Sequence, residues 1–269
     1  MAQDAFQLTG SAAEIYEDQK VPAMFRPLAE ATLNAVPLFV DDSILDVACG
    51  TGIVARKIRE RVGLSARIVG ADLNEGMIDA ARKLKDPYAQ TCEWHVCDVC
   101  DMPFDAGDFS IAFCQQGLQY FPDEIAALTE IKRVLRHDGR IALTVWSGPS
   151  AFFEALALSL AKYVDESTAE RSLAPFGYKG RDTLEARLGE LGFSGTSRHE
   201  LAVDRVIMSP EVSIRKEILG TPVGPSVEEK GDVVMQQIVQ EVTEALSGFR
   251  RGSDLVIPQH THLFQAKLH

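Results

Sequence analysis

Two glycines and an alanine near residue 50 have a spacing that is typical of nucleotide-binding proteins. In the stretch "ILDVACGTGIVARKI", residues 44–58, Gly50, Gly52 and Ala55 form the pattern G-x-G-x-x-A between an apolar run and an amphipathic one. Glycines at such a turn let the backbone bend sharply and approach a ligand closely, and the helix that follows presents its positive N-terminus. The pattern therefore predicts a cofactor that carries an adenosine group.

Two acidic residues near this turn narrow the choice of cofactor. Asp72 lies 20 residues beyond Gly52, where a carboxylate can accept hydrogen bonds from both ribose hydroxyls of an adenosine. Asp46 lies ahead of the turn, where a pyrophosphate would bring like charges together in a desolvated site. A methionine ammonium or a sulfonium would be attracted to the same carboxylate. Asp46 thus favours S-adenosylmethionine over NAD.

The elements that must position these residues alternate along the chain. Short β-branched runs predict strands at 43–47, 66–72, 92–98, 109–116 and 140–146. Apolar residues at helical spacing predict the intervening helices at 53–62, 75–85 and 123–135. Such alternation indicates an α/β fold, a doubly wound parallel sheet with helices on both faces. Its ligands bind outside the carboxyl ends of the strands, where Asp46 and Asp72 are expected.

Five motifs, in order and in spacing, resemble the class I S-adenosylmethionine-dependent methyltransferases. They are "LDVACGTG", "GADLNEGMIDAAR", "CDVCDMPF", "DFSIAFCQQGLQYFPD" and "IKRVLRHDGRIALTVW", and they cover about residues 40–147. The most similar branch is the small-molecule group that includes ubiquinone/menaquinone-type C-methyltransferases. The resemblance implies a Rossmann-like seven-stranded sheet whose last strand is antiparallel. It also implies S-adenosyl-L-methionine as cofactor and S-adenosyl-L-homocysteine as product.

The resemblance assigns a role to each matching position of the cofactor site. Asp46 would hold the methionine ammonium group, and Asp72 would bind the ribose hydroxyls. The residues that would line the methionine moiety are Ala48, Cys49, Gly50 and Gly52, with Gln115 closing that side. The residues expected around the adenine are Leu73, Met77, Asp98 and Val99. Cys97 departs from the pattern, because relatives often have glycine there.

The catalytic residues remain unknown from the sequence. Other relatives carry histidine or asparagine in the stretch that here contains Gln115, Gln116 and Gln119, so no catalytic role transfers directly. The candidates are Gln116, Gln119 and His199, the histidine expected near the carboxyl end of the sixth strand. Methyl transfer requires mainly that donor and nucleophile are held in line and that water is excluded. The lack of a readable base therefore does not argue against it.

The whole chain, 1–269, is expected to form a single methyltransferase domain with added segments. The cofactor-binding core would be 40–147, the N-terminal helical lid 1–35, and the cap insertions over the substrate site 148–180 and 205–250. Aromatic residues in these segments suggest a small, partly apolar or aromatic substrate, and they are Tyr16, Phe25, Phe152, Phe176 and Tyr178. A hydrophobic core within the cap explains the same aromatic pattern equally well.

Composition and charge exclude several other classes. The 269 residues carry a formal net charge of −12, which argues against nucleic acid, since that partner needs a basic stripe. The four cations Arg56, Lys57, Arg59 and Arg61 are expected to form a solvated helix face. Neither a signal peptide nor an apolar run of membrane-spanning length is visible. We therefore expect a cytoplasmic protein with no membrane partner.

The five cysteines predict free thiols, because an odd number without an export signal is typical of a reducing compartment. Cys92, His95, Cys97 and Cys100 have a spacing that resembles a zinc site. In a strand, however, Cys92 faces away from His95 and Cys97, and four ligands on opposite faces cannot converge on one ion. No metal is expected.

Three alternatives to methyl transfer stay open at this point. An NAD(P)-dependent oxidoreductase would explain Gly50, Gly52 and Ala55, but the chain lacks a Tyr-x-x-x-Lys pair. A binding protein that uses the cofactor as a sensor or scaffold is the second. The third is an enzyme with the same fold that runs another reaction, such as a cyclisation. The sequence does not decide the substrate, the methylated element, or whether a homodimer forms.

Overall fold

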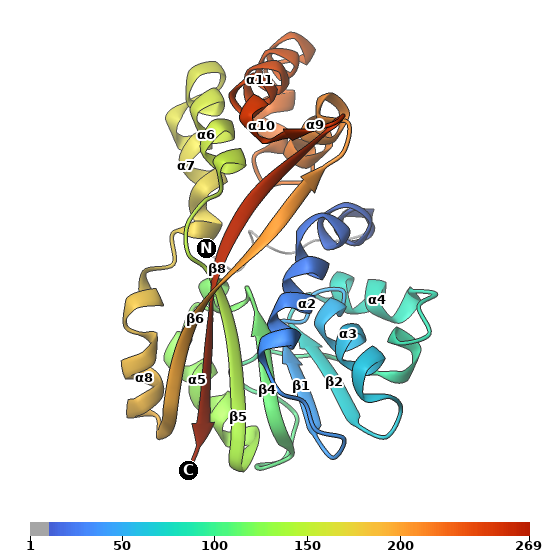
Figure 1. Ribbon diagram of the computed structural model, residues 1–269, viewed down its shortest axis with the longest axis vertical. Coiled ribbons are helices and arrows are strands. Elements are labelled where there is room, and N and C mark those ends of the chain that lie inside the picture. The colour runs from blue at the N-terminus through green and yellow to red at the C-terminus, as the bar shows by residue number, and fades with distance from the viewer. Residues whose placement is uncertain (1–10) are drawn as a thin grey trace.

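One mixed sheet runs through the computed structural model, which describes residues 11–269 (Figure 1). Its strand order is β3-β2-β1-β4-β5-β8-β6. The strands on this path are β1 (Ser43–Val47), β2 (Arg67–Asp72), β3 (Glu93–Val96), β4 (Phe109–Gln115), β5 (Leu135–Trp146), β6 (Phe193–Ile207) and β8 (Asp254–Leu268). The two-residue β7 (Arg250–Arg251) pairs with β8. Strands β1 to β5 are parallel, and β8 is antiparallel to both β5 and β6, so the predicted doubly wound sheet with an antiparallel last strand is confirmed.

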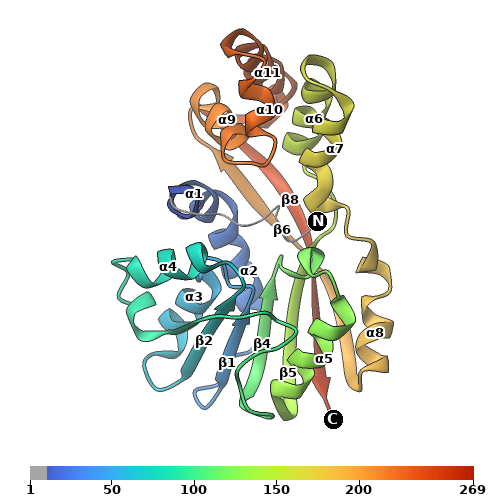
Figure 2. The same ribbon diagram turned by 180° about the vertical axis from the view of Figure 1, so that it is seen from behind.

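Helices cover both faces of the sheet, because its central strands are buried on both sides (Figures 1 and 2). They are α2 (Arg26–Ala35), α3 (Ile53–Val62), α4 (Glu75–Lys83), α5 (Glu124–Val134) and α8 (Leu184–Glu190). Successive residues of a strand point to opposite faces. Ile44 therefore joins the core beneath α2 and α3, whereas Leu45 joins the core beneath α5 and α8. α4 lies along β2 and β3.

A second lobe is built on the far ends of β6 and β8, which are 15 residues long each. Beyond the pair Trp146 and Thr261, β8 has no partner in β5 and continues with β6 as a two-stranded ribbon (Figure 1). A two-stranded ribbon is only marginally stable by itself in water, and here helices pack around it. We call these helices the cap, and they are α6 (Ala151–Tyr163), α7 (Glu166–Leu173), α9 (Pro210–Leu219), α10 (Gly224–Glu228) and α11 (Asp232–Ala245).

The N-terminal segment lies between the two lobes (Figure 2). It comprises α1 (Ser11–Ile15) and the π-helical segment η2 (Tyr16–Phe25), and α2 follows it. The widened helix is visible at its end, where the Arg26 N–H donates to the Val21 carbonyl five residues earlier. Val21 is buried in the core of the sheet and Met24 in the core of the cap. We call α1 and η2 the lid, because they contact both lobes.

Several element bounds differ from the sequence expectation. β5 begins at Leu135 rather than 140, because Leu135 already pairs with Phe109. β3 covers only Glu93–Val96 of the expected 92–98, the part that pairs with β2. The short helical turns are η3 (Ala89–Thr91), η4 (Leu118–Tyr120), η5 (Ala174–Phe176), η6 (Lys179–Asp182) and η7 (Ser247–Phe249).

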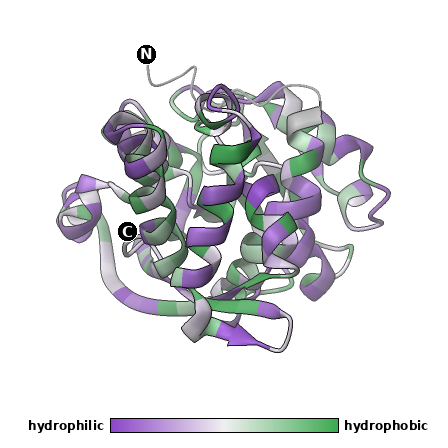
Figure 3. Cartoon of the chain, turned by 90° about the horizontal axis from the view of Figure 1, so that it is seen from above, coloured by the Kyte–Doolittle hydropathy of each residue, from purple (hydrophilic) through white to green (hydrophobic). Residues whose placement is uncertain are grey.

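The helices combine hydrophilic and hydrophobic faces, as the view from above shows (Figure 3). In α3, for example, Ile58 is fully buried while Glu60 is exposed. None of the helices described between residues 11 and 269 has both the length and the apolar character that crossing a bilayer requires. The helices instead bury one face against the sheet or against the cap ribbon.

The Trp94 ring fills a space that two glycines leave open. A Cβ added at Gly70, in the middle of β2, would lie 2.4 Å from the Trp94 ring. One added at Gly52 would lie 2.1 Å from the same ring. The Trp94 Nε1–H donates to the Ala89 carbonyl at 3.0 Å, which fixes the ring in place. The ring thereby joins β2 and β3 to the start of α3.

We predict that Gly70→Ala destabilises the fold, because the added methyl group must displace an indole that cannot move freely. Overpacking of this kind costs about 1–3 kcal/mol, and the melting temperature should fall by several degrees. Gly189→Ala is the matched control, since a Cβ at that helical position meets nothing within 4 Å. It should be neutral or slightly stabilising. Equal melting temperatures for the two variants would contradict this packing argument.

Candidate active site

The turn after β1 has a left-handed backbone at three positions. Ala48, Gly50 and Gly52 have φ values of 53°, 56° and 82°. The Gly52 N–H donates to the Cys49 carbonyl at 2.9 Å, and α3 begins directly afterwards. Glycine adopts positive φ without a steric penalty, which is why the fingerprint has its glycines here. The structure therefore places the predicted loop at the carboxyl edge of β1, directly ahead of α3.

Asp72 joins this loop to the end of β2. Its Oδ2 accepts the Gly50 N–H at 2.8 Å, and its Oδ1 accepts the Asn74 N–H at 2.8 Å. Asn74 in turn caps α4 by accepting the Met77 N–H. Burial raises the pKa of Asp72, and the two backbone N–H groups oppose that shift. One carboxylate thus orders both the loop and the start of the next helix.

Asp46 is buried, and no ion pair joins it to a cation among residues 11–269. Its side chain is 1% exposed, and its Oδ2 accepts the Ala55 N–H at 3.1 Å. Burial raises the pKa of Asp46 to about 8, and the charge of Asp72 adds to the shift. A buried acid with one hydrogen bond is costly to keep. Its position is more suited to a ligand that brings positive charge than to structural support.

Four buried oxygen atoms at this edge have no hydrogen-bond partner among the described residues. They are Asp46 Oδ1, Thr51 Oγ1, Gln115 Oε1 and Gln119 Oε1. Buried polar atoms are nearly always paired, so such a group of unpaired acceptors is unusual. A ligand rich in donors or positive charge would satisfy them, and an ammonium group has three donors. The chemistry of the site thus fits the methionine end of S-adenosylmethionine better than a phosphate.

The residues expected around the adenine lie at the ends of β2 and β3. Leu73 is 46% exposed directly after Asp72, whereas Met77 is 7% exposed on the inner side of α4. Asp98 lies in the turn after β3, where its Oδ1 accepts the Cys100 N–H at 2.8 Å, and Val99 packs beside the sheet core. Leu73 is therefore the most open apolar side chain of this group.

Tyr16 of the lid lies over the loop. A Cβ at Gly50 would lie 3.8 Å from the Tyr16 hydroxyl oxygen. Burial raises the pKa of Tyr16 well above its usual value, and the nearby Tyr120 and Asp72 add to the shift. Gln115 also holds the lid in place. Its Nε2 donates to the Phe25 carbonyl at 3.2 Å, which joins the end of the lid to β4. The lid therefore covers the loop on its ligand side.

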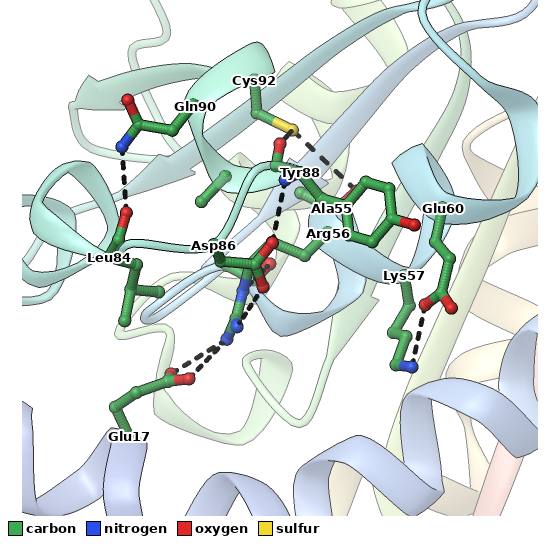
Figure 4. Close-up of polar contacts among 12 residues, drawn as sticks. Glu17, Ala55, Arg56, Lys57, Glu60, Leu84, Asp86, Tyr88, Gln90 and Cys92 are labelled. Carbon is green, nitrogen blue, oxygen red and sulfur yellow. Dashed lines mark hydrogen bonds and ion pairs between the residues drawn. The ribbon is translucent and has the colours of Figure 1, made fainter.

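Arg56 fastens the lid to α3 (Figure 4). Its Nη2 lies 2.8 Å and 3.0 Å from the two carboxylate oxygens of Glu17, and its Nη1 lies 3.0 Å from Asp86 Oδ2. Its Nε donates to the carbonyl of Gly52 in the loop. The predicted solvated face is wrong for Arg56 and Arg59, which are both 4% exposed. The helical pattern could not predict this burial, because the carboxylates that pair with Arg56 come from segments distant in sequence.

The lid and cap aromatics form a row. The ring centroids of Tyr16 and Phe25 are 5.3 Å apart, Phe25 and Trp146 6.4 Å, and Trp146 and Phe176 6.0 Å. Phe176 continues into the cap core, where Phe152 is fully buried. The structure therefore joins Tyr16, Phe25 and Phe176, whereas Phe152 lies inside the cap.

The other candidates are spread over the carboxyl edge. Tyr178 packs with the sheet core beneath α5 and α8 and lies beside Glu124, apart from the aromatic row. Gln116 is 5% exposed at the end of β4, and Gln119 follows in η4. His199 is level with Gln115 in the strand register but is exposed on the edge strand β6, with β5 and β8 between them. The two glutamines flank Gly117, where an added Cβ would lie 2.6 Å from the Cβ of Ala48 in the loop.

Comparison with known proteins identifies the same region. Residues 44–139 match the family described as a methyltransferase domain. The chain is 30% identical over 178 residues to a ubiquinone/menaquinone biosynthesis C-methyltransferase of Geobacter sp. (strain M21), covering 59% of this chain and 73% of that protein. It is 36% identical over 109 residues to a demethylmenaquinone methyltransferase of Lactococcus lactis, covering 40% of this chain and 43% of that protein. The chain thus spans less than half the length of some curated relatives it matches.

Solved structures share the fold at low sequence identity. The phosphoethanolamine N-methyltransferase 2 of Haemonchus contortus, in complex with S-adenosyl-L-methionine, has a TM-score of 0.60 at 19% identity. That match covers 98% of this chain and 58% of the other. The YcgJ protein of Bacillus subtilis has a TM-score of 0.57 at 16% identity, and the match covers 90% of this chain and 97% of that protein. The sheet and its helices are therefore those of a known architecture.

We predict that affinity for S-adenosylhomocysteine rises with pH through the titration of Asp46. With a pKa of about 8, roughly one tenth of Asp46 is ionised at pH 7 and roughly nine tenths at pH 9. Only the ionised form attracts an ammonium group, so the dissociation constant should fall several-fold between pH 7 and pH 8.5. Calorimetric titration checks this, and Asp46→Asn should bind more weakly and lose the pH dependence.

The same pKa predicts a stability gain in Asp46→Asn. An acid whose folded pKa lies above its unfolded value destabilises the fold as pH rises through the interval between them, here from about 4 to about 8. The apo variant should therefore melt above the wild type at pH 7 but not at pH 4. Identical melting temperatures at both pH values would show that Asp46 is not held protonated.

We predict that Glu17→Gln weakens cofactor retention while leaving the sheet intact. The change removes one of the two carboxylates on the buried Arg56, so the lid should open more often and the cofactor should dissociate faster, by about tenfold. Glu14→Gln, an exposed position on the same lid, is the matched control. Stopped-flow dissociation rates compare the two, and equal rates would mean that this ion pair does not hold the lid.

Proposed function

The chain belongs to the class I S-adenosylmethionine-dependent methyltransferases, and on that basis we propose that it methylates a small, partly apolar aromatic molecule of the quinol type. The observation that carries the proposal is the β1–α3 loop with Asp72 on Gly50 and the unpaired oxygen of Asp46 beside it. Bound S-adenosylmethionine supplies a methyl carbon made electrophilic by its sulfonium. The remaining work belongs to the protein, which must bind, orient and exclude water.

Each part of the loop has an assigned task in this proposal. Asp72, already oriented by two backbone N–H groups, accepts the ribose hydroxyls. Asp46 and Gln115 present their unpaired oxygens to the methionine ammonium group. The residues that line the methionine moiety are Ala48, Cys49, Gly50 and Gly52. Leu73 and Met77 pack on the adenine, and Asp98 and Val99 meet its amino edge.

The lid and the cap supply the rest of the enclosure. In this proposal the predicted lid, residues 1–35, of which residues 1–10 lie outside the described part of the chain, closes the cofactor side, and residues 148–180 and 205–250 cover the substrate. Tyr16, Phe25 and Phe176 give the substrate planar apolar walls. Such walls exclude water, and water would otherwise compete for the positions of donor and acceptor.

The quinol type is proposed from the relatives and from reactivity. Relatives include proteins named demethylmenaquinone methyltransferase and 2-phytyl-1,4-naphtoquinone methyltransferase. An oxidised quinone ring is electron-poor and a weak nucleophile, whereas the reduced diol has an electron-rich ring carbon beside each hydroxyl. A flat fused ring could stack on aromatic side chains such as Tyr16 and Phe25, which are only partly buried. The ring releases one proton to solvent for each methyl group that it gains.

A calorimetric and a turnover experiment test the proposal together. Wild-type protein is titrated with S-adenosylmethionine, S-adenosylhomocysteine and NAD, and then assayed for methyl transfer to 1,4-naphthalenediol under anaerobic conditions. Asp72→Asn should bind the adenosyl cofactors at least about tenfold more weakly, since it loses a charge-assisted contact. Asp41→Asn, at an exposed position, is the control.

The outcomes separate the alternatives. Binding of NAD in place of the adenosyl cofactors would overturn the assignment of the loop. Cofactor binding without methyl transfer to the diol or to other hydroxylated aromatics would favour a sensor or a different reaction on the same fold. Tight S-adenosylmethionine binding with a methylated product supports the proposal.

A further inference from the structure

A chain of hydrogen bonds with a fixed direction runs from the sheet to the carboxyl edge. The Thr261 hydroxyl donates to the Val145 carbonyl at 2.8 Å, which uses its only hydrogen. Its oxygen then accepts the Gln116 Nε2 at 2.7 Å. The Gln116 amide nitrogen must therefore face Thr261, and its Oε1 faces the other way. Side-chain amides are ambiguous in isolation, but here the threonine fixes the orientation.

The direction carries over to the next glutamine. Gln119 Nε2 donates to Gln116 Oε1 at 3.5 Å, and the Gln119 amide also supports the neighbouring Tyr120 hydroxyl. The bond to Gln116 uses the nitrogen side of the Gln119 amide. Gln119 Oε1 is left as a buried acceptor without a partner among residues 11–269. An unsatisfied amide oxygen is costly inside a protein, so this one is suited to a group that arrives from outside.

The end of this hydrogen-bond chain lies near the cofactor loop and near the aromatic row. A Cβ at Gly117 would lie 2.6 Å from the Ala48 Cβ, so the segment packs directly on the cofactor loop. The neighbouring Tyr120 raises the pKa of Tyr16, which covers Gly50 and begins the aromatic row. Gln116 itself has a φ of 56°, a left-handed backbone that non-glycine residues adopt at a cost. This strained residue directly follows the end of β4, at the border of the proposed site.

From this geometry we infer that Gln119 Oε1 is a specificity-determining acceptor, which selects methyl acceptors that carry a hydroxyl or N–H donor beside the reacting atom. The inference rests on the proposed function and adds the residue that reads the substrate. A diol presents a hydroxyl hydrogen to this oxygen. A quinone presents a carbonyl, and two carbonyl oxygens facing each other repel. Gln119 thereby distinguishes the reduced, nucleophilic ring from the oxidised one.

The test compares the two redox states of one ring system. Dissociation constants for 1,4-naphthalenediol, 1,4-naphthoquinone and 1,4-dimethoxynaphthalene are measured anaerobically by calorimetry on protein saturated with S-adenosylhomocysteine. The wild type should prefer the diol over both other ligands. Gln119→Leu should bind the diol at least tenfold more weakly and the quinone no worse than the wild type does.

Two further variants separate recognition from folding. Thr261→Val frees the Gln116 amide to turn over, so it should lose part of the diol preference without changing affinity for S-adenosylhomocysteine. Gln237→Leu, at an exposed position in α11, should behave like the wild type. Gln119→Leu should still bind S-adenosylhomocysteine, which shows that the variant is folded and that its cofactor loop is intact.

The failures of the two proposals are distinguishable. If Gln119→Leu keeps the wild-type preference for the diol, the inference about Gln119 is overturned, even where methyl transfer proceeds normally. Wild-type protein that binds S-adenosylhomocysteine but shows no preference between diol and quinone overturns it as well. Wild-type protein that does not bind S-adenosylhomocysteine overturns the proposed function itself, and the inference with it.

Discussion

The hydrogen bond from the Gly50 amide to the Asp72 carboxylate joins the ends of the first two strands, and the geometry of the site depends on it. The turn after β1 needs left-handed backbone at three positions, and such a turn is held only where neighbouring groups fix it. Asp72 fixes it from β2 while its other oxygen orders the start of α4. The register of β1 with β2, in which Val47 pairs with Ala71, brings these groups together.

Around this contact the protein keeps acceptors that its own fold does not satisfy. Asp46, Gln115 and Gln119 each contribute a buried oxygen without a partner within the described chain. Each one costs stability, and the large cores beneath the helices and within the cap offset that cost. The arrangement is typical of a site that is organised before its ligand binds, because the acceptors of the protein are already in place for the donors of the ligand.

The lid connects the two lobes through charges of opposite sign. Glu17 pairs with Arg56 of α3, and three residues later Lys20 pairs with Glu217 of the cap helix α9 at 3.5 Å. Glu217 also lies 2.8 Å from the buried Arg205, and these two cations lower the pKa of Glu217 to about 2. The two ion pairs therefore fasten the lid to both lobes, one to α3 and the other to the cap helix α9.

The sequence by itself determined the sheet, its helices and the cofactor loop, because these follow from short-range patterns. Alternating apolar runs predict the parallel strands, and the spacing of Gly50, Gly52 and Asp72 predicts where a nucleotide would lie. The family resemblance added the antiparallel β8. None of this needs knowledge of contacts between distant segments.

Only the tertiary structure decided which side chains surround that loop. Arg56 sits in a helix whose pattern predicts solvent exposure, yet Glu17, 39 residues earlier, and Asp86, 30 residues later, bury it. Gln116 is oriented by Thr261, which is 145 residues away along the chain. Burial, ion pairing and amide orientation depend on which segments the fold brings together, and local periodicity contains no record of that.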